Sequence, residues 1–181
     1  MSERVIRPAV EADLAAIVRI YAHHVTAGLA SFEETPPDLA EINRRWRAIA
    51  AAGLPYVVAV LPGENVLAGY AYAGPYRPRS AYRFSVEDSI YLDPRFQGHG
   101  LGRAWLTRLI VDATALGKRQ MIAVIGDSAN QASIGLHRAL GFELTGTFHG
   151  IGFKFGRWVD SVLMQRALGP GAGSAPADER F

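Results

Sequence analysis

The sequence contains no cysteine. This absence excludes disulfide bonds, thiolate metal sites and catalysis by a cysteine nucleophile. A structural zinc site would need histidine and carboxylate ligands alone, and the five histidines show no ligand spacing. His23 and His24 are adjacent on an expected helix and point in different directions, so we expect both to lie on the surface. The sequence therefore predicts no bound metal.

Long apolar runs and a strong net charge are also missing. No run reaches the roughly 18 apolar residues that a membrane span requires. Residues 1–10, MSERVIRPAV, lack the apolar segment of a signal peptide. The formal net charge is only +2 at pH 7, which gives no reason to expect a nucleic-acid partner. We expect a soluble, cytoplasmic protein that binds neither a membrane nor nucleic acid.

The 181 residues, of which 49% are hydrophobic and 20% charged, fit one globular domain. We assign residues 1–168 to this domain. Residues 169–181, GPGAGSAPADERF, are rich in Gly, Pro, Ala and Ser and show no apolar period. The sequence predicts that this C-terminal tail is disordered.

Helix-like and strand-like patterns alternate along the chain, which predicts a mixed α and β class. The expected helices cover about residues 11–26, 38–52, 101–116 and 129–140. The expected strands cover residues 4–7, 56–61, 66–73, 85–92, 121–125, 142–149 and 159–167, with a hairpin turn at residues 62–65.

One glycine-rich segment stands out. Residues 95–105 read RFQGHGLGRAW and lie between a strand-like run and a helix-like run. The dinucleotide fingerprint G-x-G-x-x-G would need its third glycine at position 103, which is Arg103. A Walker A loop needs Gly-Lys followed by Ser or Thr, and the only Gly-Lys pair, Gly117-Lys118, is followed by Arg119. Both of these nucleotide-binding motifs are therefore excluded.

The pattern that remains is Q-x-x-G-x-G. Glycine lets the backbone approach an anion closely, and the N-terminus of the helix that begins near residue 101 favours negative charge. A plain tight turn is the alternative, as is a helix cap for Asn130 and a solvated helix position for Ser133. We predict a phosphate-binding loop made of Gln97, Gly98, His99, Gly100, Leu101, Gly102 and Arg103.

The order of strand, Q-x-x-G-x-G loop, helix, strand and N-x-x-S helix resembles the GCN5-related N-acetyltransferases. The downstream part of the resemblance rests on Asn130, Ser133, His137 and the Gly141-Phe142 pair, and the whole covers about residues 5–168. It implies that the loop binds the pyrophosphate of acetyl-CoA, together with Asn130 and Ser133. The implied fold is of the α/β (α+β) class. Its mixed, mostly antiparallel central sheet is splayed between the fourth and fifth strands and flanked by helices.

The resemblance also implies where this co-substrate lies. Acetyl-CoA would occupy the gap between the strand around residues 89–92 and the strand around residues 121–125. Ile90, Tyr91 and Leu92 would then bind it, and a backbone N–H near Tyr91 or Leu92 would bind the thioester oxygen as negative charge develops there. No metal is implied.

Residues 74–83, GPYRPRSAYR, followed by SVEDSIYLDP look like the phosphinothricin and methionine sulfoximine acetyltransferase branch of that family. The resemblance implies that Arg77, Arg79 and Tyr82 hold an amino acid substrate and that Phe32 lies near it. The planar fork of an arginine can grip a carboxylate or a phosphinate in two places. A solvated basic loop is the alternative.

Glu87 would open the catalytic strand as general base and as part of the substrate site. The attacking amine is largely protonated at neutral pH, and a carboxylate within one water of it can take that proton, most effectively if burial raises its pKa. Asp88 is adjacent and points to the opposite face of the strand, so we rank it below Glu87. His137 stands where many family members have a Tyr that protonates the departing CoA thiolate. That role, support of Glu87 in a dyad, and a core histidine all remain open.

Because cysteine is absent, we expect direct transfer in a ternary complex. The branch resemblance implies a homodimer in which the early loop, with Phe32, lies near the neighbouring subunit's site. Another amine, such as an ordinary amino acid, a polyamine or a protein N-terminus, is the main alternative, although the Arg77 and Arg79 pair disfavours cationic polyamines. A non-catalytic CoA-binding module and a nucleotide-binding regulator are alternatives of other classes.

Overall fold

The computed structural model describes residues 5–61, 66–98 and 100–176 of the chain. Within these ranges seven strands form one sheet in the order β1-β2-β3-β4-β5-β7-β6. The β4 and β5 strands are parallel, and every other neighbouring pair is antiparallel. The predicted mixed, mostly antiparallel sheet flanked by helices is confirmed.

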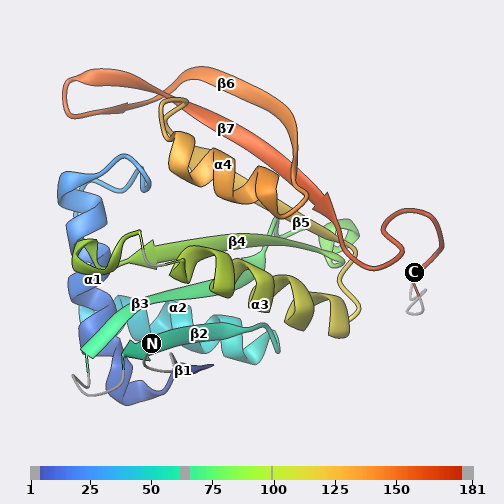
Figure 1. Ribbon diagram of the computed structural model, residues 1–181, viewed down its shortest axis with the longest axis horizontal. Coiled ribbons are helices and arrows are strands. Elements are labelled where there is room, and N and C mark those ends of the chain that lie inside the picture. The colour runs from blue at the N-terminus through green and yellow to red at the C-terminus, as the bar shows by residue number, and fades with distance from the viewer. Residues whose placement is uncertain (1–4, 62–65, 99, 177–181) are drawn as a thin grey trace.

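Helices cover both faces of this sheet. Figure 1 shows α1 and α2 on one face and α3 and α4 on the other. The strands are β1 (Val5–Pro8), β2 (Tyr56–Leu61), β3 (Val66–Pro75), β4 (Ser85–Leu92), β5 (Gln120–Gly126), β6 (Glu143–Lys154) and β7 (Arg157–Ala167). The helices are α1 (Leu14–Ala27), α2 (Leu39–Ala51), α3 (Leu101–Ala115) and α4 (Gln131–Ala139).

The predicted elements form close to their predicted bounds. Asp38 caps α2 by accepting a hydrogen bond from the Glu41 amide at 2.8 Å, and a 3₁₀ turn over residues 11–13 precedes α1. The last two strands are longer than the predicted 142–149 and 159–167, and the β6–β7 pairing continues beyond a register irregularity between Phe148 and Gly152. The hairpin turn expected at residues 62–65 lies outside the described residues.

The apolar stripe predicted on α3 packs into the core. Trp105, which is 0% exposed, fits against Gly69 of β3 so closely that a Cβ there would lie 2.7 Å from its ring. This contact fixes α3, and so the glycine loop before it, against the sheet. All six predicted stripe residues are buried, namely Leu101, Trp105, Leu106, Leu109, Ile110 and Ala113.

The sheet opens between its two parallel strands. The pairing of β4 with β5 runs only from Ser85–Gln120 to Glu87–Ile122. Beyond Glu87, β4 stays paired with β3 as far as Leu92, while β5 stays paired with β7 as far as Gly126. The two strands therefore diverge, which confirms the predicted splay and leaves a gap between their carboxyl ends.

The chain beyond β7 forms turns where it is described. Arg119 donates hydrogen bonds to the carbonyl oxygens of Gly171 and Ala175. The division at residue 168 and the disorder of residues 169–181 stay predictions. Among the described residues, no helix has the length and apolar character needed to cross a membrane.

Candidate active site

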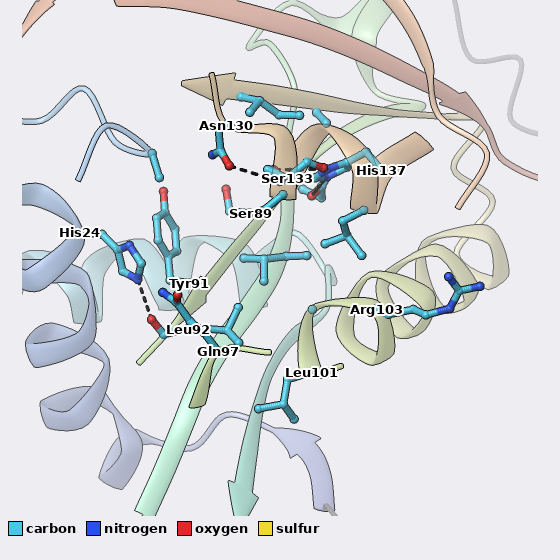
Figure 2. A pocket seen from close by; sticks show the side chains of 18 of the residues that line it. His24, Ser89, Tyr91, Leu92, Gln97, Leu101, Arg103, Asn130, Ser133 and His137 are labelled. Carbon is cyan, nitrogen blue, oxygen red and sulfur yellow. Dashed lines mark hydrogen bonds and ion pairs between the residues drawn. The ribbon is translucent and has the colours of Figure 1, made fainter. Parts of the chain in front are cut away.

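A cavity of about 540 Å³ opens in the gap between β4 and β5. Figure 2 shows side chains from both strands, from the start of α3 and from α4 converging on it. His99 lies outside the described residues. The other predicted cofactor-binding residues all line the cavity: Ile90, Tyr91, Leu92, Gln97, Gly98, Gly100, Leu101, Gly102, Arg103, Asn130 and Ser133.

The glycine loop has positive φ angles at two of its glycines, a conformation that is strained for residues with a side chain. Gly98 and Gly100 have φ angles of 78° and 73°, in the left-handed region where only glycine is unstrained. Gly102 is helical, and a Cβ there would lie 3.2 Å from the Leu136 side chain of α4. Two glycines therefore shape the turn, and the third lets α3 approach α4.

The start of α3 offers unpaired backbone donors. Its N-cap is Gly100, which has no side chain to accept a hydrogen bond from the first-turn N–H groups. These groups, with the helix dipole, favour an anion. The Arg103 side chain is exposed and extends along the outer side of α3 in Figure 2, so in this structure it lies away from the centre of the gap.

Asn130 acts as a helix cap as well as a cavity residue. Its side chain accepts a hydrogen bond from the Ser133 amide at 3.2 Å, so α4 begins at residue 131 rather than at the predicted 129. The Ser133 hydroxyl lies 3.4 Å from His137 Nδ1. Asn130 therefore caps α4 and also lines the cavity, and its contact with acetyl-CoA stays a prediction.

The free edge of β4 presents alternate backbone groups to the gap. The Asp93 amide donates to Ala68 of β3 at 2.9 Å. Because N–H groups alternate between the two edges of a strand, the Leu92 N–H points the other way, toward the gap. The Leu92 carbonyl, left without a strand partner there, accepts a hydrogen bond of 2.7 Å from His24 Nε2.

His24 is a residue whose position the sequence predicted wrongly. His23 is exposed as expected, but His24 is half-buried, lines the cavity and contacts Leu92. Burial lowers the pKa of His24, so at neutral pH the ring is neutral and donates its Nε2 proton. The hydrogen-bonded pair lies 68 residues apart in sequence, which leaves no local signal.

His137 pairs with Asp88 at the closed end of the gap. His137 Nε2 lies 3.0 Å from Asp88 Oδ2, and its Nδ1 lies 2.7 Å from the Ser133 carbonyl oxygen. Burial opposes protonation of His137, but the hydrogen bond and charge of Asp88 outweigh it and raise the pKa above its ordinary value. The expected alternative of a His137–Glu87 dyad is wrong for this structure, because both ring nitrogens have other partners.

Glu87 lies on the opposite face of β4 and is half-buried. Burial and then the negative charge of Asp88 raise the pKa of Glu87 to about 7, while the charge of Arg77 acts the other way. A carboxylate with this pKa is poised to take and release a proton near neutral pH. Glu87 and the Asp88–His137 pair thus lie on the two faces of β4.

A cluster of tyrosines, which was not predicted from the sequence, forms the wall behind Glu87. The rings of Tyr56 and Tyr72 stack at 5.1 Å between centroids, and Tyr21 meets Tyr91 edge-on at 4.9 Å. Tyr72 pairs with Ser89 across β3 and β4, and Ser89 lies two residues from Glu87 on the same face of β4. Alternation of aromatic residues along β3 is the signal that would have found this wall.

The predicted substrate-binding residues follow β3, near Glu87. The Arg77 guanidinium lies 5.2 Å from the centre of the Tyr76 ring, and Tyr76 meets Tyr82 edge-on at 5.7 Å. The charges of Arg77 and Glu87 influence each other. Arg79 is exposed, and its carbonyl oxygen accepts a hydrogen bond from the Tyr82 amide at 3.0 Å. Both arginine side chains are exposed, and of the two only Arg77 lies close enough to Glu87 for their charges to interact.

Phe32 packs against its own chain at the end of β5. A Cβ built on Gly152 would lie 2.5 Å from the Phe32 ring, and one on Gly126 would lie 3.2 Å from it. Lys154 fixes the same loop by donating to the carbonyl oxygens of Gly28 and Ser31 at 2.9 and 2.7 Å. Phe32 keeps 41% of its surface exposed and lies beside Gly126, which lines the cavity.

A stability prediction follows from the close docking of this loop. We expect Gly126→Val to lower the free energy of unfolding by about 1–3 kcal/mol, because the new side chain would overlap the Leu29 carbonyl oxygen and the Phe32 ring. Gly135→Ala is the control. It lies in α4 with open space around it and should raise stability by roughly 1 kcal/mol. Urea unfolding measures both, and an unchanged Gly126→Val variant would contradict the docking.

Residues 17–142 match the acetyltransferase (GNAT) family. The chain therefore belongs to this family, as the glycine loop and the downstream N-x-x-S motif predicted.

Particular relatives narrow the comparison. The chain is 53% identical over 173 residues to a phosphinothricin N-acetyltransferase of Alcaligenes faecalis, covering 96% of this chain and 85% of the relative. It is 45% identical over 165 residues to an L-methionine sulfoximine/L-methionine sulfone acetyltransferase of Pseudomonas paraeruginosa, covering 91% and 95%. A crystal structure of a phosphinothricin acetyltransferase from Sinorhizobium meliloti in complex with acetyl-CoA superposes with a TM-score of 0.94 at 50% identity, covering 100% and 96%.

Proposed function

We propose that the protein is an acetyl-CoA-dependent N-acetyltransferase that acetylates the α-amino group of phosphinothricin, methionine sulfoximine or methionine sulfone. One observation carries this proposal. The free edge of β4 has a long cavity with an anion-binding loop on one side and a carboxyl of pKa about 7, Glu87, on the other. The names of the relatives at 53% and 45% identity support the substrate class.

Acetyl-CoA fits the cavity by its chemistry. The pyrophosphate would lie at the Gly98–Gly102 turn, where backbone N–H groups and the α3 dipole favour an anion. The pantetheine arm would run along the gap toward Asp88. Its amides would face the edges of β4 and β5 beyond Glu87 and Ile122, where the two strands no longer pair. The N–H of Leu92 faces this gap and is the better candidate, of the two considered, for a polar contact with the arm or the thioester.

The acid and base would work from opposite faces of β4. Glu87 takes a proton from the substrate ammonium through a water, and the free amine attacks the thioester carbon directly. The new C–N bond forms as the C–S bond breaks. Both nitrogens of His137 have partners in the protein, so the CoA thiolate takes a proton from the Ser133 hydroxyl, which lies 3.4 Å from His137 Nδ1 and regains its proton from that ring. Glu87 then releases its proton to solvent. Because the chain has no cysteine, no acetyl-cysteine intermediate forms on it.

The amino acid would be held by the loop after β3. Arg77 lies near Glu87 and beside the Tyr76 and Tyr82 rings, so it can grip a carboxylate or phosphinate while the amine faces Glu87. Arg79 and Phe32 would close the pocket from either side. Arg79 lies in solvent in this structure, so its contact would depend on the substrate.

The proposed binding of the substrate anion by Arg77 and Arg79, here called the arginine clamp, predicts a change in KM. We expect Arg77→Ala to raise KM for the amino acid by about 10- to 100-fold, as loss of a charged hydrogen bond of about 1.5–3 kcal/mol implies, and Arg79→Ala to raise it less. KM for acetyl-CoA should stay within about twofold. Arg47→Ala, an exposed arginine on α2, is the control. Equal increases of both KM values would contradict the clamp.

Mass spectrometry of the product tests the function itself. Incubation with acetyl-CoA and phosphinothricin should give free CoA and a product acetylated on the α-nitrogen. A product acetylated elsewhere would contradict the assigned orientation, and no product with any of the three amino acids would favour another amine as substrate.

We further infer a cytoplasmic homodimer acting in detoxification of such amino acids, independent of metal. The apolar residues exposed on β6 and β7, including Phe148, Ile151 and Trp158, fit an interface between subunits. Among the described residues, no group of three or more metal-ligating side chains gathers. Light scattering that gives a monomer at working concentration would contradict the dimer.

A further inference from the structure

Asp88 occupies a particular place in the sheet. The last paired residues of β4 and β5 are Glu87 and Ile122, so Asp88 is the first residue of β4 beyond the point where the strands part. Its side chain is 3% exposed, and that of His137 on α4 is 5% exposed. The two side chains close the inner end of the gap, and both line the cavity.

The contacts of His137 determine its protonation. Nε2 lies 3.0 Å from a carboxylate oxygen of Asp88, and Nδ1 lies 2.7 Å from the Ser133 carbonyl oxygen. The Ser133 carbonyl oxygen can only accept, so Nδ1 must carry a proton. The short contact of Nε2 with Asp88, together with the raised pKa of His137, favours a second proton on Nε2 and hence the imidazolium form of the ring.

Asp88 has no second partner to share its charge. Its other oxygen, Oδ1, is buried and has no hydrogen-bond partner among the described residues. The neighbouring charge is that of Glu87 on the far face of β4. The other ionisable side chains that line the same cavity are His24 of α1, Tyr91 of β4 and Arg103 of α3. The part of β5 that lines the cavity contributes only Ala123–Gly126, which carries no charge.

We propose, on the basis of the proposed acetyl transfer, that Asp88 is a positioning residue that holds His137 as an imidazolium at the closed end of the gap and couples it to Glu87 across β4. The pair stores the proton that the departing CoA thiolate takes by way of the Ser133 hydroxyl, which lines the cavity 3.4 Å from His137 Nδ1. The ring then becomes neutral and regains a proton from solvent before the next turnover.

This coupling has a direction that can be measured. The charge of Asp88 raises the pKa of both His137 and Glu87. Asp88→Asn removes that charge, so both pKa values should fall. The acidic limb of the kcat/KM profile, which requires ionised Glu87, and the basic limb, which requires protonated His137, should both move to lower pH.

Nuclear magnetic resonance titration of the histidine rings in the ligand-free protein tests the pair without any substrate. We expect the pKa of His137 to lie above 6.5 and to fall by at least about 1 unit in Asp88→Asn, with His137→Asn assigning the signal. Asp112→Asn, which removes a surface partner of Arg108, is the control and should leave the signal unchanged.

The outcomes separate this proposal from the proposed function. A His137 pKa below 6.5 in the unsubstituted protein would overturn the pair even if Asp88→Asn did not fold. A fall in the His137 pKa without movement of either limb would reduce Asp88 to a structural residue. Movement of both limbs by at least about half a pH unit supports the coupling. An inactive protein with the expected His137 titration would instead count against the acetyl transfer.

Discussion

Glu87→Gln should lower kcat by about 10²- to 10⁴-fold, the usual contribution of a general base. Glutamine keeps the shape of the side chain and removes its proton-accepting oxygen. The affinity for acetyl-CoA should stay within about twofold, because Glu87 is not among the residues that line the cavity. Steady-state thiol release and equilibrium titration with acetyl-CoA measure the two effects separately.

The pH dependence gives Glu87 a second signature. Its folded pKa, about 7, lies above the ordinary value of 4.5, so kcat/KM should rise with pH through about 7. Glu143→Gln, at an exposed position on β6, should keep both rate and profile. A Glu87→Gln enzyme that retains kcat within about twofold, a change of only ~0.4 kcal/mol in the barrier, would show that another group is the base.

The raised pKa of Glu87 also predicts that Glu87→Gln increases the free energy of unfolding at alkaline pH. A carboxyl whose folded pKa is raised destabilises the folded state as pH rises through its unfolded and then its folded value, because the unfolded chain ionises more readily. Glu87→Gln should therefore unfold at higher urea concentration than the unsubstituted protein at pH 8, and the two should converge near pH 4. Equal midpoints at pH 8 would mean that Glu87 is not held in a destabilising environment.

His137→Asn should lower the free energy of unfolding by about 3–5 kcal/mol at pH 6, because it leaves the buried Asp88 charge without its partner. The double variant Asp88→Asn/His137→Asn should recover part of this loss, since neither side chain is then charged. Urea unfolding of four proteins, namely the unsubstituted protein, Asp88→Asn, His137→Asn and the double variant, completes a double-mutant cycle.

The loss should depend on pH with a definite sign. The folded pKa of His137 is raised above 6.5, so its stabilising contribution is complete below pH 6.5 and declines as pH rises through the folded value. The deficit of His137→Asn should therefore be smaller at pH 9 than at pH 6. His149→Asn, at an exposed position on β6, is the control. A deficit below about 1 kcal/mol at pH 6 would contradict a charged pair.

Local patterns in the sequence predicted much of the fold. The apolar stripe of α3 is buried as its helical period indicated, and the glycine loop before it lines the cavity. These features depend on residues within about 20 positions of one another, where periodicity and turn chemistry act directly. The β6–β7 hairpin was predicted too short. Its pairing continues past the register irregularity between Phe148 and Gly152 as far as Lys154 and Arg157.

The contacts that complete the site were beyond such patterns. His137 meets Asp88 across 49 residues, and His24 meets Leu92 across 68. Strand alternation correctly placed Asp88 opposite Glu87 and led to its lower rank, but nothing local indicated that α4 would bring a histidine onto that face. Such pairs depend on the order of strands in the sheet, which sequence periodicity does not determine.

CoA thiol release with a panel of amines tests the central claim most directly. The chain has no cysteine to react with the thiol reagent. The panel would include phosphinothricin, methionine sulfoximine, methionine sulfone, ordinary amino acids and spermidine. We expect the first three to give the highest kcat/KM and spermidine to give no turnover above the rate without amine. Turnover of spermidine with none of the three amino acids would contradict it.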